Sequence, residues 1–131
     1  AFRLCASTQA FVKEPLIRLT DRLSTFLETL DGVEIRGCRT NRLANTVSFT
    51  VSDSDSMILL ANLDMEGVCA SSGSACSAGS LEPSHVISAL GPEPSRPEAF
   101  VRFSLGRDST DDEVDAVIDV LPDINARSRN L

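Results

Sequence analysis

The sequence contains no tryptophan or tyrosine, a single lysine (Lys13) and a single histidine (His85). Six phenylalanines are its only aromatic residues, so the core must be built mostly from aliphatic side chains. The net charge of −7 argues against a nucleic-acid partner, because phosphate binding needs clustered lysine and arginine. No apolar run approaches the length of a membrane span, and the mixed first residues do not resemble a signal peptide. We therefore expect a cytoplasmic protein that binds neither nucleic acid nor membrane.

Cysteine is present at four positions, an even number that leaves a disulfide framework open. Nothing else in the sequence suggests secretion, and reduced thiols are the default for a cytosolic chain. A zinc site is not expected, because Cys69 and Cys76 lie seven residues apart rather than two to four, and His85 is the sole histidine. We therefore expect reduced thiols and no metal.

The length of 131 residues is enough for one core, so residues 1–131 are expected to form a single domain. The missing initiator methionine fits processing or excision from a longer protein. Apolar periodicity predicts helices over about 16–30, 54–66, 83–90 and 110–121, and strands over about 33–35, 46–51, 68–70 and 99–105. Within the second helix, Met57, Leu60 and Leu63 form the expected apolar stripe. The last helix is expected to begin at a capping box, Thr110-Asp111-Asp112-Glu113, and the polar tail from Asn125 should fray. This order indicates an α+β fold, in which helices cover a small, mostly antiparallel sheet.

Residues 71–80 contain nothing larger than a cysteine, and Cys76 lies in their middle. Segments rich in serine and glycine behave as flexible chain, so a thiol on such a tether could react at one place and then at another. This pattern suits a cysteine that transfers a chemical group. The plain alternative is a linker whose cysteine is a small buried apolar residue. No lysine, arginine or histidine lies within eight residues of Cys76, so the sequence does not reveal what would ionise its thiol.

Two polar residues in or beside the expected strands are further candidates. Arg102 alternates with apolar residues, where an unpaired guanidinium would be costly, so a carboxylate partner is expected. One of the 19 acidic residues of the chain could supply that carboxylate. Asn45 precedes a strand, where its amide could cap a turn. The other polar candidates are expected to be structural: Cys5, Cys38 and Cys69 to pack, His85 to cap or to face solvent, and Arg107 to support the fold.

Several motifs together resemble the C-terminal part of the cysteine desulfurases, in the subgroup with a long cysteine loop. The most specific is Ser71-Ser72-Gly73-Ser74-Ala75-Cys76 with Leu81-Glu82-Pro83-Ser84 after it. Residues 41–49, 63–68 and 101–107 add to the likeness, which extends from about Leu16 to Leu121. In that pyridoxal-phosphate (PLP) family, related to the class V aminotransferases, L-cysteine is converted to L-alanine.

The resemblance implies a role for each candidate. Cys76 would be the nucleophile that receives the sulfur as a persulfide and passes it to an acceptor, such as an iron–sulfur scaffold protein. Arg102 would hold the carboxylate of the substrate, and Asn45 would lie near the substrate. Ala44 stands where the family usually has proline, which leaves the conformation of this turn open. The resemblance also implies a homodimer and the small-domain fold of fold-type I PLP enzymes.

The resemblance requires a lysine that binds the cofactor, and this chain has no lysine in the expected sequence context. PLP enzymes of this type hold the cofactor as a Schiff base on a lysine. The sequence around Lys13 does not resemble the expected Ser-x-His-Lys context. We therefore expect residues 1–131 to be the small, C-terminal domain of a longer desulfurase, with no covalent PLP on this chain alone.

Two alternatives stay open at this point. The chain could be a stand-alone persulfide carrier that uses Cys76 without a cofactor. It could also be a dimerisation or docking domain with no chemistry of its own.

Overall fold

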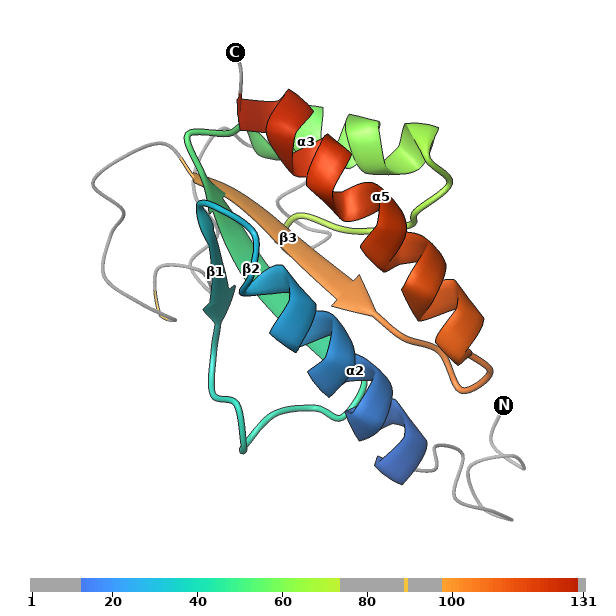
Figure 1. The fold of residues 1–131 in the computed structure, drawn as a ribbon. Coiled ribbons are helices and arrows are strands. Elements are labelled where there is room, and N and C mark those ends of the chain that lie inside the picture. Colours follow the sequence, from blue (N-terminus) through green and yellow to red (C-terminus); the bar gives the residue numbers. More distant parts are fainter. Residues whose placement is uncertain (1–12, 74–88, 90–97, 130–131) are drawn as a thin grey trace.

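An antiparallel sheet with the strand order β1-β2-β3 forms the centre of the computed structural model, which describes residues 13–73, 89 and 98–129. Its strands are β1 (Val33–Arg36), β2 (Thr46–Ser52) and β3 (Glu98–Ser104). Helices α2 (Lys13–Leu27), α3 (Ser56–Met65) and α5 (Asp111–Arg129) complete the described fold (Figure 1). The expected α+β architecture is confirmed.

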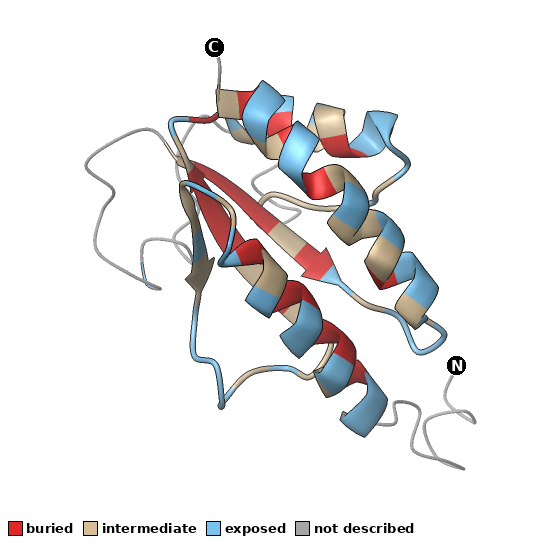
Figure 2. Cartoon of the chain, viewed as in Figure 1, coloured by how far each residue is buried: buried red, intermediate tan, exposed pale blue. Residues whose placement is uncertain are grey.

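One face of the sheet carries the core, because alternate residues of a strand point to opposite sides. On that face Phe49 of β2 is paired with Val101 of β3, and both are almost fully buried. Helix α2 presents leucines at intervals of three and four residues to the same core: Leu16, Leu19, Leu23 and Leu27. Figure 2 shows the buried residues of the helices on the sides that face the sheet and exposed residues on the outer sides.

The two long helices are joined at the surface by ion pairs. Arg18 of α2 donates to both carboxylate oxygens of Asp111 at 2.6 and 2.8 Å, and Arg22 pairs with Asp115. The hydrogen bond from Arg18 lowers the pKa of the Asp111 carboxyl. Because these groups are exposed, the ion pairs contribute little to the free energy of unfolding, and we expect them mainly to orient the two helices.

The end of α5 differs from the expectation. The helix continues to Arg129, so the frayed tail expected from Asn125 is wrong, and Ile124 and Ser128 are fully buried. Asn125 and Arg129 donate hydrogen bonds to the backbone carbonyl of Asp31, at 3.0 and 2.8 Å. The polar residues of this segment therefore anchor the last turns of α5 to the turn before β1.

Helix α3 also departs from the expected pattern. Asp55 caps its first turn by accepting hydrogen bonds from the backbone amides of Met57 and Ile58. Leu59 and Leu63 are its buried residues, whereas Met57 is 72% exposed, so the expected stripe was wrong at Met57. Apolar residues occur on both sides of the helix, since Met57 is exposed while Leu59 and Leu63 are buried, and periodicity alone therefore does not reveal which face is buried.

The other expected elements have mixed outcomes. Strands 33–35, 46–51 and 99–105 are confirmed within one or two residues, and the Thr110–Glu113 capping box forms with hydrogen bonds of 2.9 and 3.3 Å. Residues 68–70 do not form a strand, and pairing there is limited to Ser71. The helix expected over 83–90 lies outside the described residues, apart from residue 89. None of the described helices is long and apolar enough to cross a membrane.

Gly32 provides a test of how α5 packs against the turn before β1. Its φ is +73°, and a Cβ atom there would lie 2.6 Å from Ser52 Oγ and 2.8 Å from Arg129 Cζ. Gly67 has a similar φ of +75°, but a Cβ atom would meet nothing within 4 Å. Both alanine substitutions strain the backbone, but only Gly32→Ala also adds overpacking. Gly32→Ala should therefore lower the unfolding free energy by about 1–3 kcal/mol more than Gly67→Ala does. Urea denaturation of both variants measures the difference, and equal losses would contradict the contacts of Gly32.

Candidate functional site

Arg102 lies in the middle of β3, on the face of the sheet opposite the helices. Its register partner on β2 is Ser48, whereas its sequence neighbours Val101 and Phe103 face the core. Along the edge of β3 that does not pair with β2, Arg102 exchanges two backbone hydrogen bonds with Ser71. The Arg102 N–H donates to Ser71 O at 2.7 Å, and the Ser71 N–H donates to Arg102 O at 3.2 Å. The first residue of the small-residue run is therefore held directly beside Arg102.

The guanidinium of Arg102 is incompletely partnered. Its Nε atom is buried and has no hydrogen-bond partner among the described residues. Arg36 on the same face is different, because it donates to Glu98 Oε2 at 2.7 Å and to Thr50 Oγ1 at 3.0 Å. A buried donor without an acceptor costs free energy, so the Nε atom of Arg102 could still donate a hydrogen bond to an acceptor outside the described residues.

Cys76 itself lies outside the described residues. It follows Ser71 by five residues, and five residues of fully extended chain span at most about 18 Å. The pairing of Ser71 with Arg102 therefore limits how far the thiol can lie from the strand that carries Arg102.

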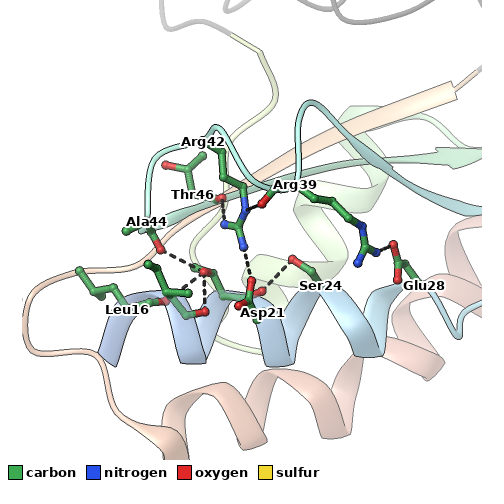
Figure 3. Close-up of polar contacts among 10 residues, drawn as sticks. Leu16, Asp21, Ser24, Glu28, Arg39, Arg42, Ala44 and Thr46 are labelled. Atoms are coloured by element: carbon green, nitrogen blue, oxygen red, sulfur yellow. Dashed lines mark hydrogen bonds and ion pairs between the residues drawn. The ribbon is translucent and has the colours of Figure 1, made fainter. Parts of the chain in front are cut away.

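Asn45 joins the start of β2 to the end of β3. Its side-chain amide donates to the backbone carbonyl of Leu105 at 3.2 Å, and its backbone carbonyl accepts from the backbone amide of Leu105 at 2.8 Å. The neighbouring Ala44 is held from α2, since its carbonyl accepts from the Thr20 hydroxyl at 3.0 Å (Figure 3). These contacts describe a structural clamp, and contact of Asn45 with substrate stays a prediction.

A cavity of about 540 Å³ lies between α2, β1, β2 and the loop 37–45, and no sequence pattern had predicted it. Two ion pairs hold the loop to α2 and to the turn that follows it: Arg42 pairs with Asp21 of the helix at 2.6 Å, and Arg39 pairs with Glu28, the first residue after the helix (Figure 3). Only Arg39 and Arg42, two charges in a polar loop, could have suggested this attachment.

The loop 37–45 also contains a thiol. Cys38 is exposed, and so is Cys69, so the expectation that these two cysteines pack is wrong. Hydrogen bonding with the Thr40 hydroxyl, followed by the backbone amides of Asn41 and Thr40, lowers the pKa of the Cys38 thiol. Both cysteines are free, and no group of three metal-ligating side chains occurs among the described residues.

Lysine is absent from the neighbourhood of Arg102 in the described fold. The only lysine of the chain, Lys13, is the first residue of α2, in the helical layer, whereas Arg102 lies on the other face of the sheet. The residues present therefore do not fit a covalent PLP site.

Comparison with known proteins places these features in a family. The family model described as Aminotransferase class-V matches residues 1–117. A cysteine desulfurase from Nostoc sp. is 44% identical over 115 residues, which cover 87% of this chain and 29% of that protein. The cysteine desulfurase IscS of Methanosarcina thermophila is 40% identical over 116 residues, 88% of this chain and 29% of that protein. The chain thus spans less than a third of the length of these relatives.

Solved structures agree with the sequence relatives. A NifS-like protein from Rickettsia africae superposes with a TM-score of 0.70 at 25% identity, over 96% of this chain and 32% of the other. A second NifS-like protein, at 23% identity and a TM-score of 0.73, supports the fold. The chain belongs to the class-V aminotransferase family, in which the relatives compared here are cysteine desulfurases.

Proposed function

We propose that residues 1–131 are the C-terminal small domain of a cysteine desulfurase that converts L-cysteine to L-alanine. The observation that carries the proposal is the 44% identity to a cysteine desulfurase over 87% of the chain. The pairing of Ser71 with Arg102 supports it, because this contact joins the strand of Arg102 to the start of the segment 71–80, which contains Cys76.

In this proposal Cys76 is the nucleophile. Its thiolate attacks the sulfur of the substrate, the carbon–sulfur bond of L-cysteine breaks, and the sulfur remains on Cys76 as a persulfide. The carbon skeleton leaves as L-alanine after gaining a proton, so no external oxidant or reductant is needed. Arg102 binds the substrate carboxylate with the donor that lacks a partner in the described fold, and Asn45 keeps β2 and β3 aligned beside the substrate.

The rest of the enzyme would complete the site. PLP supplies an electron sink for reactions at amino-acid substrates, and we propose that a part of the protein outside this chain holds it on a lysine. We further propose a cytoplasmic homodimer that passes the persulfide sulfur to a protein acceptor, such as a scaffold for iron–sulfur cluster assembly.

The intact mass and the visible absorption spectrum of the native protein, purified from its source, test this proposal together. We expect a chain about three times as long as this one, because the sequence covers 29% of the Nostoc relative, and a yellow colour from bound PLP. A colourless native chain of 131 residues would contradict the proposal and favour a stand-alone persulfide carrier.

A further inference from the structure

The sheet face opposite the helices (Figure 1), which we call the outer face, carries two arginines in one row of paired residues. Arg36 of β1 is paired with Ser48 of β2, and Ser48 is paired with Arg102 of β3. Adjacent strands lie about 4.8 Å apart, so the backbones of the two arginines are about 10 Å apart and their side chains leave the same face. Two guanidinium groups at this spacing repel each other unless a carboxylate neutralises one of them.

The outer face has few carboxylates. Among the residues of the three strands only Glu34 and Glu98 are acidic, and both lie on the outer face, since alternate positions of a strand share a face. Both contact the same group, because Arg36 Nη2 is 2.7 Å from Glu98 Oε2 and 3.1 Å from Glu34 Oε2. The Glu98 side chain is 19% exposed and that of Glu34 is 67% exposed, so water screens the pair with Glu34 much more. Glu98 is therefore the main counter-charge of Arg36.

The side chain of Arg36 is held in one direction by two contacts. Its Nε atom donates to the Thr50 hydroxyl at 3.0 Å, and its Nη2 atom donates to Glu98, four residues before Arg102 on β3. Thr50 is 2% exposed and belongs to the middle strand of the sheet. These contacts draw the guanidinium of Arg36 diagonally across β2 toward Glu98, rather than straight across Ser48 toward Arg102.

The same contacts leave Arg102 without a strand carboxylate. Both acidic strand residues of the outer face contact Arg36, and the buried Nε atom of Arg102 has no hydrogen-bond partner among the described residues. A guanidinium already paired with a carboxylate of its own domain would have to exchange it for the carboxylate of a substrate, and this exchange would weaken binding. The position of Arg36 therefore bears on what Arg102 can bind.

We propose that Arg36 is a positioning residue for substrate binding: it holds the Glu98 carboxylate, so that Arg102 stays free for the carboxylate of L-cysteine. The inference rests on the proposed function, because it gives Arg36 a part in the substrate binding proposed for Arg102. Arg36 acts through charge and need not touch the substrate. Without Arg36, Arg102 is the only strand cation of the outer face, and the two freed carboxylates compete with the substrate for it and repel the substrate.

Arg36→Gln in the full-length enzyme tests the proposal, because glutamine can still donate a hydrogen bond but carries no charge. We expect KM for L-cysteine to rise about 5- to 20-fold, the effect of one uncompensated charge at about 10 Å in a partly buried site, with little change in kcat. Initial rates of alanine formation measure both constants. Arg127→Gln is the matched control, because it also removes one positive charge from an ion pair, the pair with Glu66 at 2.8 Å in the helical layer, and it should leave KM unchanged.

Substitutions of Glu98 separate the effect of charge from support of the sheet. Arg36→Gln combined with Glu98→Gln removes both charges of the main pair, so KM should return to within about twofold of the unaltered value. Glu98→Gln alone keeps both arginines and removes the competing carboxylate, so it should leave KM unchanged or lower it. A purely structural ion pair is lost in all three variants and would lower kcat and Tm alike in each. Thermal unfolding and the absorption spectrum of bound PLP record the state of every variant.

Three results overturn the role of Arg36: an unchanged KM in Arg36→Gln, an equal rise in KM in the double variant, or a rise in KM in Glu98→Gln. The last of these is available even if Arg36→Gln does not fold. Each leaves the proposed function intact, provided that the unaltered enzyme forms alanine from L-cysteine. If the unaltered enzyme forms no alanine, the proposed function fails, and the role of Arg36 in substrate binding fails with it.

Discussion

Full-length enzyme with Cys76→Ala is expected to lose desulfuration of L-cysteine by a factor on the order of a thousand or more, as is usual when a catalytic nucleophile is removed. The physical reason is that only a thiolate is a good nucleophile toward sulfur at neutral pH. Alanine leaves the size of the residue nearly unchanged in a segment of small side chains, so the loss should reflect chemistry rather than folding.

Alanine and sulfide formed from L-cysteine provide the measurement, with an absorption spectrum to verify that the variant still binds PLP. The matched controls are Cys38→Ala and Cys69→Ala, because both thiols are exposed and free. The control at Cys38 is the stricter one, since hydrogen bonds lower the pKa of that thiol as well. Full activity of Cys76→Ala, or a comparable loss in either control, would remove Cys76 from its proposed role.

Arg102→Ala is expected to raise KM for L-cysteine about 10- to 100-fold, the value of losing a hydrogen bond between charged groups. The effect should fall mainly on KM, because the carboxylate of the substrate keeps the same charge throughout the reaction. Arg102→Lys should restore little of the loss, since an ammonium lacks the planar fork that binds a carboxylate with two donors.

Cysteamine, which is L-cysteine without its carboxylate, makes this test specific. The unaltered enzyme should strongly prefer L-cysteine, and Arg102→Ala should lose most of that preference. Arg107→Ala is the control, because Arg107 lies just after β3 and forms an exposed pair with Asp108 at 3.1 Å. An unchanged KM in Arg102→Ala would show that the buried Nε atom is a structural feature and no part of the substrate site.

Local patterns in the sequence predicted most elements of the fold. Helix α2 followed from leucines spaced three and four residues apart, and the start of α5 followed from its capping box. Strands β2 and β3 followed from alternation, which also separated Arg102 from its core-facing neighbours. These predictions succeeded because each depends on residues within a few positions of one another.

Predictions that depended on distant residues were less successful. The end of α5 was missed because Asn125 and Arg129 bind a carbonyl more than 90 residues away, at Asp31. Met57 was assigned to the core because a helix with apolar residues on opposite sides has no preferred face until its neighbours are in place. The exposure of Cys38 was missed because it depends on how the loop 37–45 is attached to α2.

The sequence by itself determined the candidates: a thiol in a run of small residues, an arginine in an apolar strand, and a single lysine in the wrong context. These depend on residue type and order alone. Only the tertiary structure decided that Ser71 pairs with Arg102, that Arg102 Nε lacks a partner among the described residues, and that Met57 of α3 is exposed. Pairing, burial and exposure arise between segments that are remote in sequence, so they exist only when the chain has folded.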